Sequence, residues 1–318
     1  MEKIDILLAT YNGEKYLKEQ LDSILNQTYS NFRLIISDDC SNDNTKQILE
    51  EYKQKDDRIE VYYQNENLGY IKNFEFLLGK VENKFYALSD QDDIWLSEKL
   101  EKYIENMKNN NSDLVFGDLI VVDENGQEIN KSFWKLKGFS KKIKKDKNYK
   151  GLQLNNYITG CTILSKKEFL KYILPLPEAK YIIHDYWIAI VVSAKGKISH
   201  IDKPYIKYRQ HSNNQVGYKT KSEELESIEE IRKLFIDVKI EHFEIFEKYE
   251  MLFDEKTRKI NKKALSYYKK LKEVKNINFR NWSLFYKLYK YENLKYQILN
   301  FIILNMPIIA KMLYKKRR

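Results

Sequence analysis

Three carboxylates fall within four positions of one another in the stretch LSDQDDIW (residues 88–95), namely Asp90, Asp92 and Asp93. Like charges this close repel one another, but a divalent cation between them makes such a cluster tolerable. Oxygen ligands suit Mg²⁺ or Mn²⁺, and an ion with few protein carboxylates keeps positions for substrate phosphates. The alternative is that the acids cap a helix beginning at Ser97. Because three acids stand together and an apolar pair follows them, we favour the metal site.

Polar residues also follow three earlier apolar runs of the sequence. They are Thr10-Tyr11-Asn12 after residues 4–9, Asp38-Asp39 after 32–37, and Asn65 to Gly69 after 58–63. Ligands of open α/β sheets bind beyond the carboxyl ends of the strands. If the runs are parallel strands, the four polar groups meet at one edge of the sheet. Their coincidence argues for a binding site more strongly than any one of them.

The elements that position these residues follow from the hydrophobic pattern. Short aliphatic runs alternate with amphipathic stretches in the first half, which is typical of βαβ units and a parallel sheet. We expect strands at 4–9, 32–37, 58–63 and 84–89, and helices at 14–26, from Ser41 or Asp43 to 52, at 69–78 and at 97–109.

The second half is less regular. We expect strands within 114–129 with a hairpin turn at Asn125-Gly126, followed by a mobile lysine-rich loop at 131–150. Further strands are expected at 159–165, 198–202 and 204–211. A helix should start at His184, and the pattern is helical from about 220. The prediction is an α/β domain over 1–218 and a helical region over 219–318.

Several other functional classes lack their sequence signatures. No GxGxxG follows the first strand and no GxxxxGK[ST] occurs, which argues against dinucleotide-binding and P-loop proteins. The acidic segments lack the glycine and distal glutamate of an EF-hand loop. Cys40 and Cys161 are far apart and outside any CxxC spacing, which argues against a disulfide framework or structural zinc and fits a reducing cytoplasm. The N-terminal segment does not resemble a cleavable signal, since its apolar run is short and flanked by acids.

The net charge of +10 is concentrated near the C-terminal end of the 318 residues. Residues 1–218 hold 32 basic and 32 acidic side chains, residues 219–260 hold 9 and 12, and residues 261–318 hold 15 and 2. An anionic partner would therefore meet this last segment. Residues 296–318 are apolar and end in Lys-Lys-Arg-Arg, but polar interruptions leave them short of a clean membrane span.

We therefore expect the segment 296–318 to lie at an anionic membrane surface as an interfacial helix. The alternative is a packed helical subdomain or a homodimer interface with a solvated basic face. No recognised nucleic-acid-binding module is present, so we expect no nucleic acid partner.

The combined motifs resemble a known family. The stretches ILLATYNGEKYL, SILNQTYSNFRLIISDDCSNDNT, ENLGYIKNF and SDQDDIW, in this order, resemble family 2 glycosyltransferases of the GT-A fold over roughly residues 3–215. SDQDDIW, HDYW and YRQHSNNQVG further resemble the bacterial rhamnosyltransferase-like branch. The resemblance implies a Rossmann-like, mixed and mostly parallel sheet flanked by helices, followed here by the C-terminal helical extension.

The resemblance assigns donor-side roles. It implies that Thr10, Tyr11 and Asn12 line the nucleotide pocket and that Asp39 accepts the N3–H of uracil or thymine. It places Asn67, Gly69, Lys72 and Asn73 near the ribose or diphosphate. The DxD function would come from Asp90, Asp92 and Asp93. Asp92 would lie near ribose and metal, and Asp93 on the metal, with the division among the three acids left open. An ionised carboxylate only accepts hydrogen bonds, so Asp39 suits a ring that presents N–H.

The acceptor side carries the general base in an inverting transfer. The resemblance implies that Asp185 is this base, and the alternative is a helix N-cap. His184 stands where many relatives carry Glu. His211 would lie near the metal or diphosphate, or be structural. The pair Gly160-Cys161 resembles the segment that borders donor sugar and acceptor, and Trp187 could stack on a sugar; we expect Trp95 in the core.

Together these residues predict an inverting, metal-dependent glycosyltransferase with Mn²⁺ or Mg²⁺ and a nucleotide-sugar donor, dTDP-rhamnose or a UDP-sugar. The expected acceptor is a glycan or polyprenyl-linked precursor of a bacterial surface polysaccharide, at the inner face of the cell membrane. One alternative is a sugar nucleotidyltransferase, whose Gly-rich phosphate loop is missing. The other is an inactive membrane assembly subunit of the same fold, against which Asp39, Asp185 and the intact acidic motif count.

Overall fold

The computed structural model describes residues 2–146, 148–211 and 227–273, together with Tyr286, Phe301, Ile302 and Leu304. The chain forms two compact units. Unit 1 comprises residues 1–137, 157–176 and 183–213, and unit 2 comprises residues 138–156, 177–182 and 214–318. The functional division predicted at residue 218 stays a prediction.

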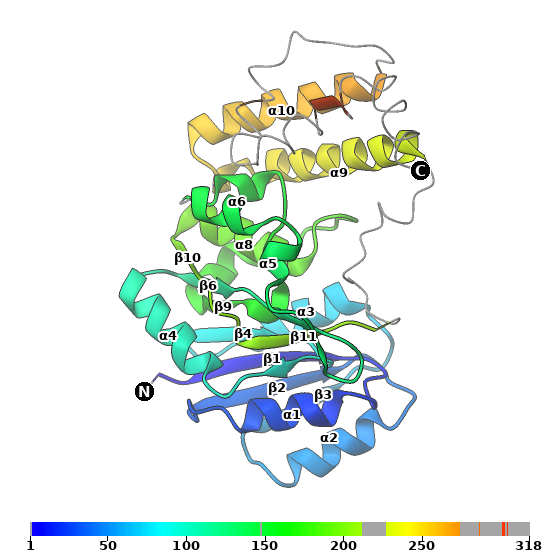
Figure 1. The fold of residues 1–318 in the computed structure, drawn as a ribbon, viewed down its shortest axis with the longest axis vertical. Helices are drawn as coiled ribbons and strands as arrows, with labels where there is room; N and C mark the ends of the chain where they lie inside the picture. Colours follow the sequence, from blue (N-terminus) through cyan, green and yellow to red (C-terminus); the bar gives the residue numbers. More distant parts are fainter. Residues whose placement is uncertain are drawn as a thin grey trace. The chain divides into compact units, whose positions relative to one another are not determined.

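Unit 1 is built on a seven-stranded sheet in the order β10-β6-β9-β4-β1-β2-β3 (Figure 1). Its strands are β1 (Ile4–Thr10), β2 (Phe32–Asp38), β3 (Ile59–Tyr63), β4 (Phe85–Ser89), β6 (Leu114–Gly117), β9 (Leu164–Lys166) and β10 (Ile198–Ile201). Neighbouring strands are parallel except at β9, which runs antiparallel to both β4 and β6. The predicted mixed, mostly parallel α/β sheet is therefore confirmed.

Amphipathic helices cover this sheet because their apolar residues recur at helical spacing. The helices of unit 1 are α1 (Leu17–Leu25), α2 (Thr45–Lys53), α3 (Tyr70–Leu78), α4 (Lys99–Asn110), α5 (Phe133–Leu136), α7 (Leu170–Ile173) and α8 (His184–Lys195). In α1, Leu17, Leu21 and Ile24 lie on one face and are fully buried in a core that includes Ile6 and Leu8 of β1. Figure 1 shows α1 and α2 on the same side of β1–β3.

Unit 1 also contains a smaller, four-stranded sheet in the order β5-β11-β7-β8. Its edge strand β5 follows the acidic stretch directly in the sequence. Its strands are β5 (Ile94–Trp95), β7 (Ile120–Val122), β8 (Glu128–Asn130) and β11 (Ile206–Arg209). The predicted hairpin is confirmed, since β7 and β8 are antiparallel and Gly126 has a φ of 80°. The sequence pattern did not predict β5, which follows Asp93 directly and pairs with β11.

Two local predictions are wrong. The segment 131–150 is not a structureless loop, because it contains α5 and α6 (Ser140–Lys145) and buries Trp134 and Ile143. The Ser132 side chain accepts a hydrogen bond from the Lys135 N–H and caps α5, a signal that was readable in the sequence. The expected strand 159–165 is shorter, because residues Gly160–Thr162 form a 3₁₀ turn, η2, before β9 begins.

Unit 2 contains the helices α9 (Ile228–Lys248) and α10 (Glu255–Glu273), as predicted for these residues. Ser227 begins α9 with a capping box completed by Glu230. The rings of Phe243 and Tyr268 stack at 5.8 Å between the two helices. Lys269 and Lys272 of α10 form ion pairs with acids of α9.

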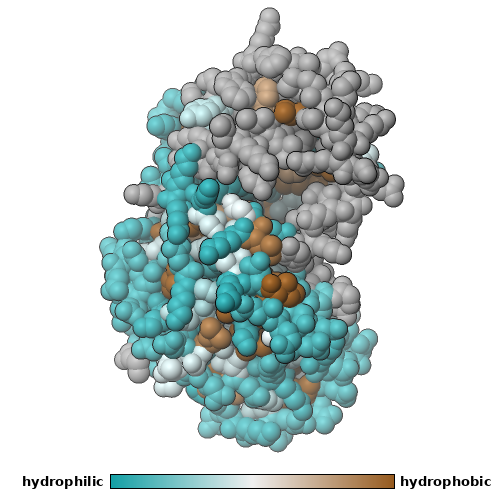
Figure 2. Space-filling view, viewed as in Figure 1, coloured by the Kyte–Doolittle hydropathy of each residue, from teal (hydrophilic) through white to brown (hydrophobic). Residues whose placement is uncertain are grey.

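The basic segment 296–318 lies outside the described residues except for Phe301, Ile302 and Leu304. Among the helices that the structure describes, none is long and apolar enough to cross a membrane. The coloured surface in Figure 2 is mostly hydrophilic and is interspersed with smaller hydrophobic areas.

Candidate active site

The acidic residues lie in a tight connection between the two sheets of unit 1. The strand β4 ends at Ser89, and the loop Asp90–Asp93 (hereafter the acid loop) leads directly into β5. Arg209 of β11 fastens this loop, because its Nε donates to the Asp92 carbonyl (2.9 Å) and its backbone N–H to Asp93 Oδ1 (3.2 Å). The acid loop is therefore fastened to β11 through the Asp92 carbonyl and one carboxylate oxygen of Asp93.

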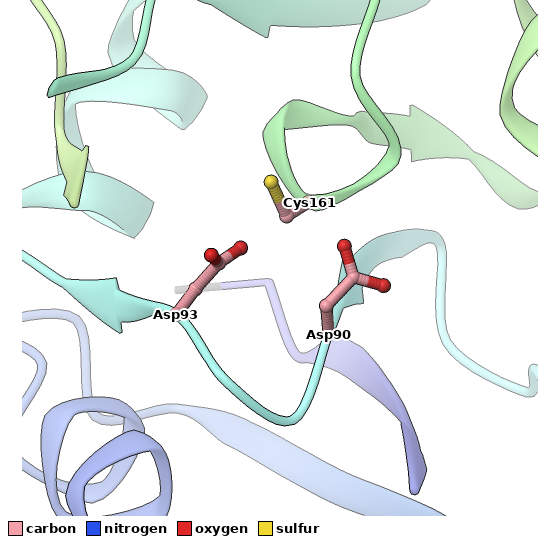
Figure 3. Close-up of side chains that lie close together, drawn as sticks. All are labelled: Asp90, Asp93 and Cys161. Carbon is pink, nitrogen blue, oxygen red and sulfur yellow. The ribbon is translucent and has the colours of Figure 1, made fainter. Parts of the chain in front are cut away.

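Two acids of this loop converge with Cys161 of η2. One ligand atom each from Asp90, Asp93 and Cys161 lies within 4.8 Å of the others, and Figure 3 shows the three side chains close together. Asp93 and Cys161 are fully buried. Asp93 Oδ2 has no hydrogen-bond partner among the described residues. A buried carboxylate oxygen in this state is costly unless a cation or donor completes it.

Burial dominates the electrostatics of this cluster. Burial and then the neighbouring Asp92 carboxylate raise the pKa of Asp90 to about 7. The same two causes, in the same order, raise the pKa of Asp93 well above its usual range. Burial followed by the charge of Asp93 raises the pKa of the Cys161 thiol. Both carboxylates are disfavoured as anions when they stand alone, so the donor set fits a divalent cation that would favour their ionised forms.

A fully buried lysine lies beside the cluster. Lys99, the first residue of α4, donates from Nζ to the Cys161 carbonyl (2.9 Å), and its ammonium lies 3.0 Å from the centre of the Trp95 ring. Burial lowers the pKa of Lys99 well below its usual range, while the charges of Cys161, Asp93 and Asp90 act in the opposite direction. Lys99 thus contacts both η2, through the Cys161 carbonyl, and Trp95, which follows the acid loop.

The third acid has a different partner. Asp92 Oδ2 lies 2.8 Å from His211 Nε2, and the His211 ring stacks on Tyr16 at 4.8 Å. The structure therefore groups the predicted metal ligands differently from the sequence analysis. Asp92 and His211 form one pair, whereas Asp93 lies with Asp90 and Cys161.

The loop after β1 is closely tied to its neighbours. The Thr10 carbonyl accepts the Asp39 N–H (2.9 Å), the Asn12 N–H donates to Ser41 Oγ (2.8 Å), and Asn12 Oδ1 accepts the Asn42 N–H (2.9 Å). The Tyr11 side chain is 42% exposed and remains open to a ligand.

Asp39 is buried and faces the loop after β3. Its Oδ1 accepts the Leu68 N–H (2.7 Å) and its Oδ2 accepts the Gly69 N–H (2.9 Å). Asn67 Oδ1 also accepts from Gly69 N–H (3.1 Å). Gly69 has a φ of 79°, a conformation that favours glycine. Asp39, Asn67 and Gly69 are therefore brought together, as the sequence predicted for one edge of the sheet.

The two remaining donor-side residues lie on α3 in different surroundings. Lys72 is half-exposed and pairs with Glu75 (2.6 Å). Asn73 is buried, and its Nδ2 donates to the Ser37 carbonyl of β2 (3.0 Å). This bond fastens α3 to β2, while Asn73 Oδ1 has no hydrogen-bond partner among the described residues, so a place for Asn73 near the ribose or diphosphate stays a prediction.

The predicted base stands where η2 meets the start of α8. Gly160 leaves room there, because a Cβ at this position would lie 3.3 Å from His184 Nε2 and 3.6 Å from Asp185 Oδ2. Asp185 is buried in the first turn of α8, and its charge acts on Asp90 and Tyr70. Gly160, His184 and Asp185 thus lie together, and, besides burial, the charge of Asp185 helps to raise the pKa of Asp90 in the acid loop.

His184 is buried between aromatic rings. Its imidazole stacks on Phe74 (4.0 Å, 18°) and meets the edge of Tyr70 (6.2 Å). Neither ring nitrogen has a hydrogen-bond partner among the residues that the structure covers. Burial lowers the pKa of His184 to about 3, so the imidazole is neutral at physiological pH.

Trp187 does not belong to this group. Its side chain is fully buried and its Nε1 donates to the Ile173 carbonyl (3.0 Å), so the predicted stacking on a sugar is corrected to a core position. Trp95 is buried, as expected.

Sequence reasoning missed three residues that shape the site, namely Gln91, Lys99 and Arg209. Lys99 carried a signal, because it occupies the same helix face as Leu100, Tyr103 and Met107, where a charge is unexpected. Arg209 contacts Asp92, Glu124 and Glu19, which are remote in the sequence, so no local pattern could have indicated it.

A mostly parallel sheet with an acid loop after β4 places the chain in the GT-A class of glycosyltransferases. Residues 5–173 match the sequence profile of the family described as Glycosyl transferase family 2. The chain therefore belongs to glycosyltransferase family 2, which confirms the resemblance, and it is a glycosyltransferase.

Individual relatives agree with this assignment. The dTDP-rhamnosyl transferase RfbG of Shigella flexneri is 33% identical over 226 residues, covering 66% of this chain and 73% of that protein. TarS 1–349 of S. aureus in complex with UDP-GlcNAc has a TM-score of 0.56 at 22% identity, over 76% of this chain and 66% of that one. The mannosyltransferase PcManGT of Pyrobaculum calidifontis, in complex with GDP-Man and Mn²⁺, has a TM-score of 0.52 at 15% identity, over 98% and 86%. The two structures support the fold.

Proposed function

We propose that the chain is an inverting, metal-dependent glycosyltransferase that takes a sugar from a nucleoside diphosphate donor. The observation that carries this proposal is the convergence of Asp90, Asp93 and Cys161 beside the polar ends of β1 and β2. The donor is dTDP-rhamnose or a UDP-sugar. RfbG, described as a dTDP-rhamnosyl transferase, supports the first choice, and TarS with UDP-GlcNAc supports the second.

The donor side binds the nucleotide and its diphosphate. Thr10, Tyr11 and Asn12 line the base and ribose, and Asp39 accepts the N3–H of the pyrimidine through its remaining lone pairs. Asn67, Gly69 and Lys72 lie toward ribose and diphosphate. Asp90, Asp92 and Asp93 would hold Mn²⁺ or Mg²⁺, with His211 beside Asp92 and Cys161 beside Asp93. The cation, when bound, offsets negative charge on the leaving diphosphate.

The base side performs the proton transfer. The Asp185 carboxylate accepts the proton of the acceptor hydroxyl while that oxygen bonds to the anomeric carbon and the bond to the diphosphate breaks. Attack from the face opposite the leaving group inverts the configuration. Gly160, with no side chain, allows the acceptor to approach, and His184 lies beside the reacting hydroxyl. A buried position keeps Asp185 away from bulk water, so it serves the acceptor and not the solvent.

The acceptor is proposed to be a glycan or polyprenyl-linked precursor of a bacterial surface polysaccharide. The Escherichia coli protein WfgD, which is 32% identical over 122 residues and is described as a glucosyltransferase acting on GlcNAc-diphosphoundecaprenol, supports a polyprenyl-linked acceptor. A position at the inner face of the membrane would follow from the basic charge of residues 261–318, which hold 15 basic and 2 acidic side chains.

A donor panel tests the reaction. Wild-type protein is incubated with UDP-, dTDP- and GDP-sugars and Mn²⁺ or Mg²⁺, and released nucleoside diphosphate is measured. Release from one donor class, dependent on the cation and stimulated by a glycan acceptor, is expected. Pyrophosphate release from a nucleoside triphosphate and a sugar phosphate would instead identify a sugar nucleotidyltransferase. Failure to bind any nucleotide sugar would point to an inactive assembly subunit.

Vesicle flotation tests the membrane proposal. The full chain should bind vesicles of anionic phospholipid and not vesicles of neutral phospholipid. Changing the terminal Lys315, Lys316, Arg317 and Arg318 to Gln should weaken binding by roughly 10³-fold, at about 1 kcal/mol per basic residue. Equal binding of wild type and variant, or a salt-resistant dimer with no vesicle binding, would contradict the proposal.

A further inference from the structure

Gln91, the second residue of the acid loop, bonds to the end of β1 and the residues after it (Thr10–Gly13, hereafter the first-strand loop). Its Oε1 accepts hydrogen bonds from Thr10 Oγ1 (2.6 Å) and from the Tyr11 N–H (2.8 Å). Its Nε2 donates to the Tyr11 carbonyl (3.1 Å). One side chain therefore grips both backbone polar groups of Tyr11 and the hydroxyl of Thr10.

These bonds link β1 to the residues after β4 beyond the end of the hydrogen-bonded pairing between the two strands. The strands β1 and β4 are paired in parallel up to Leu8 and Ser89. Beyond this point the ladder between β1 and β4 stops, although β1 stays paired with β2 up to Thr10 and Asp38. The Gln91 amide bonds to Thr10 and Tyr11 just past the last residues that pair between β1 and β4, so the acid loop and the first-strand loop stay connected beyond that ladder.

The first-strand loop is fixed on its other side to the end of β2. The Thr10 carbonyl accepts the Asp39 N–H, and the Gly13 N–H donates to Thr45 Oγ1 (2.8 Å). Asp39 in turn accepts the N–H groups of Leu68 and Gly69. A continuous series of hydrogen bonds thus runs from the acid loop, through Gln91, to the residue proposed to read the base.

We propose that Gln91 is a positioning residue that couples nucleoside binding to the binding of the diphosphate and its cation. A cation and diphosphate at the acid loop hold Gln91 in place, and Gln91 holds Thr10 and Tyr11 in the shape that receives the nucleoside. Binding at either subsite then favours binding at the other, because both ligands need the same arrangement of Gln91, Thr10 and Tyr11 and the free energy of ordering it is spent only by the first ligand. The inference rests on the proposed function, and it explains why an amide stands between Asp90 and Asp92.

A substitution at Gly13 can break the same contact without changing Gln91. A Cβ at Gly13 would lie 2.4 Å from Gln91 Oε1, 2.9 Å from Gln91 Cδ and 2.9 Å from Thr10 Oγ1. These three nearest atoms all belong to side chains, so Ala at position 13 displaces the amide without a backbone clash among them. Gly13→Ala therefore breaks the Gln91 contacts while leaving residue 91 unchanged, and Gln91→Met breaks them from the other side at similar volume.

The experiment measures the coupling directly by calorimetry. UDP, dTDP and GDP are first titrated with Mn²⁺ to find the diphosphate that wild type binds most tightly. The matching nucleoside and Mn²⁺–pyrophosphate are then titrated separately and in each other's presence. In wild type, we expect each ligand to tighten the other by about 5-fold or more. In Gln91→Met and in Gly13→Ala, this factor should fall to near 1.

The double variant Gln91→Met/Gly13→Ala should lose no more coupling than either single variant, because both remove one contact. Gln54→Met and Gly79→Ala serve as matched controls. Gln54 is exposed, and a Cβ at Gly79 would meet nothing closer than 3.3 Å. Both controls should keep the wild-type coupling factor. A purely structural role would lower the melting temperature of the variants without changing this factor.

The outcomes separate this inference from the proposed function. If wild type binds no nucleoside diphosphate, the proposed function is wrong and the inference falls with it. If wild type binds both ligands without coupling, or if both single variants keep the coupling, the proposed function stands and the role of Gln91 is wrong. Additive losses in the double variant would also overturn it, because they would show that Gly13 and Gln91 act separately.

Discussion

The loops after β1, β2 and β3 differ from the base corner, formed by η2 with His184 and Asp185, in how their polar atoms are satisfied. In the loops, Asp39 accepts two backbone N–H groups and Thr10 bonds to Gln91. In the base corner, both His184 nitrogens lack hydrogen-bond partners among the described residues. A buried polar group without a partner costs about 1–3 kcal/mol. The donor side is thus organised in advance, whereas the base corner retains unused hydrogen-bonding capacity beside Asp185.

The largest expected effect comes from removing the base. Asp185→Asn keeps the size and polarity of the side chain but cannot accept the proton of the acceptor hydroxyl. We expect kcat to fall by about 10²–10⁴-fold, while the Kd for the nucleoside diphosphate changes less than about twofold. Single-turnover transfer and calorimetry measure the two quantities. The exposed Asp57→Asn is the matched control. Full activity of Asp185→Asn would reduce this residue to a helix cap.

The next effect distinguishes the acids of the loop. Asp93→Asn replaces a buried carboxylate, whose pKa is raised by burial, with a neutral group of the same shape. We expect the fold and melting temperature to be kept and transfer to be lost, with Mn²⁺ affinity reduced by about 10-fold or more. Asp92→Asn, which instead breaks the pair with His211, serves as the comparison. A fully active Asp93→Asn would exclude Asp93 as a metal ligand.

A stability effect of intermediate size tests the boundary of the base corner. Trp187→Phe leaves a cavity and removes the donor to the Ile173 carbonyl, so the free energy of unfolding should fall by about 2–3 kcal/mol. Denaturant unfolding measures this loss. KM values for donor and acceptor should not change, because Trp187 is a core residue. A higher KM at unchanged stability would restore the stacking role that the sequence suggested.

The last effect is a pH dependence of the free energy of unfolding. The folded pKa of His184, about 3, lies below its ordinary value of 6.5, so the unfolded chain binds a proton first as the pH falls. The stability that the neutral imidazole contributes is complete above pH 6.5 and is lost toward pH 3, by up to about 1.4 kcal/mol per pH unit. His184→Phe should remove this slope and keep the stacking on Phe74. Urea unfolding at several pH values between 4 and 7 measures the difference, and parallel curves for the two proteins would contradict it.

The sequence predicted that the polar strand ends meet at one edge of the sheet, because that information is local. Each strand up to β4 is a short apolar run followed by polar residues, and the sheet's parallel order brings Thr10, Asp39 and Asp90 to one edge. Position along a strand was enough to place them. The bond from Asn73 of α3 to the Ser37 carbonyl could not be predicted in this way, because helix periodicity does not identify a side chain's partner on another strand.

The remainder depended on contacts between distant segments. Cys161 joins the acid cluster only because η2 lies beside the acid loop, although the two are about 70 residues apart in sequence. Arg209 reaches the same loop through the pairing of β11 with β5, a strand too short to be recognised by alternation. Three-dimensional neighbours of this kind leave no periodic signal in one sequence.

The antiparallel strand β9 has a consequence for variation among such enzymes. A parallel strand delivers the residues that follow it to the reactive edge, whereas β9 runs the other way and delivers the residues that precede it, Gly160 and Cys161. Within the excursion from Gly117 to β9, the strands β7 and β8 are paired, but no described residue between β8 and β9 belongs to a strand of either sheet. Insertions and deletions in that later part can therefore reshape the surroundings of Gly160 and Cys161 while the parallel strands β1, β2 and β4 stay constant.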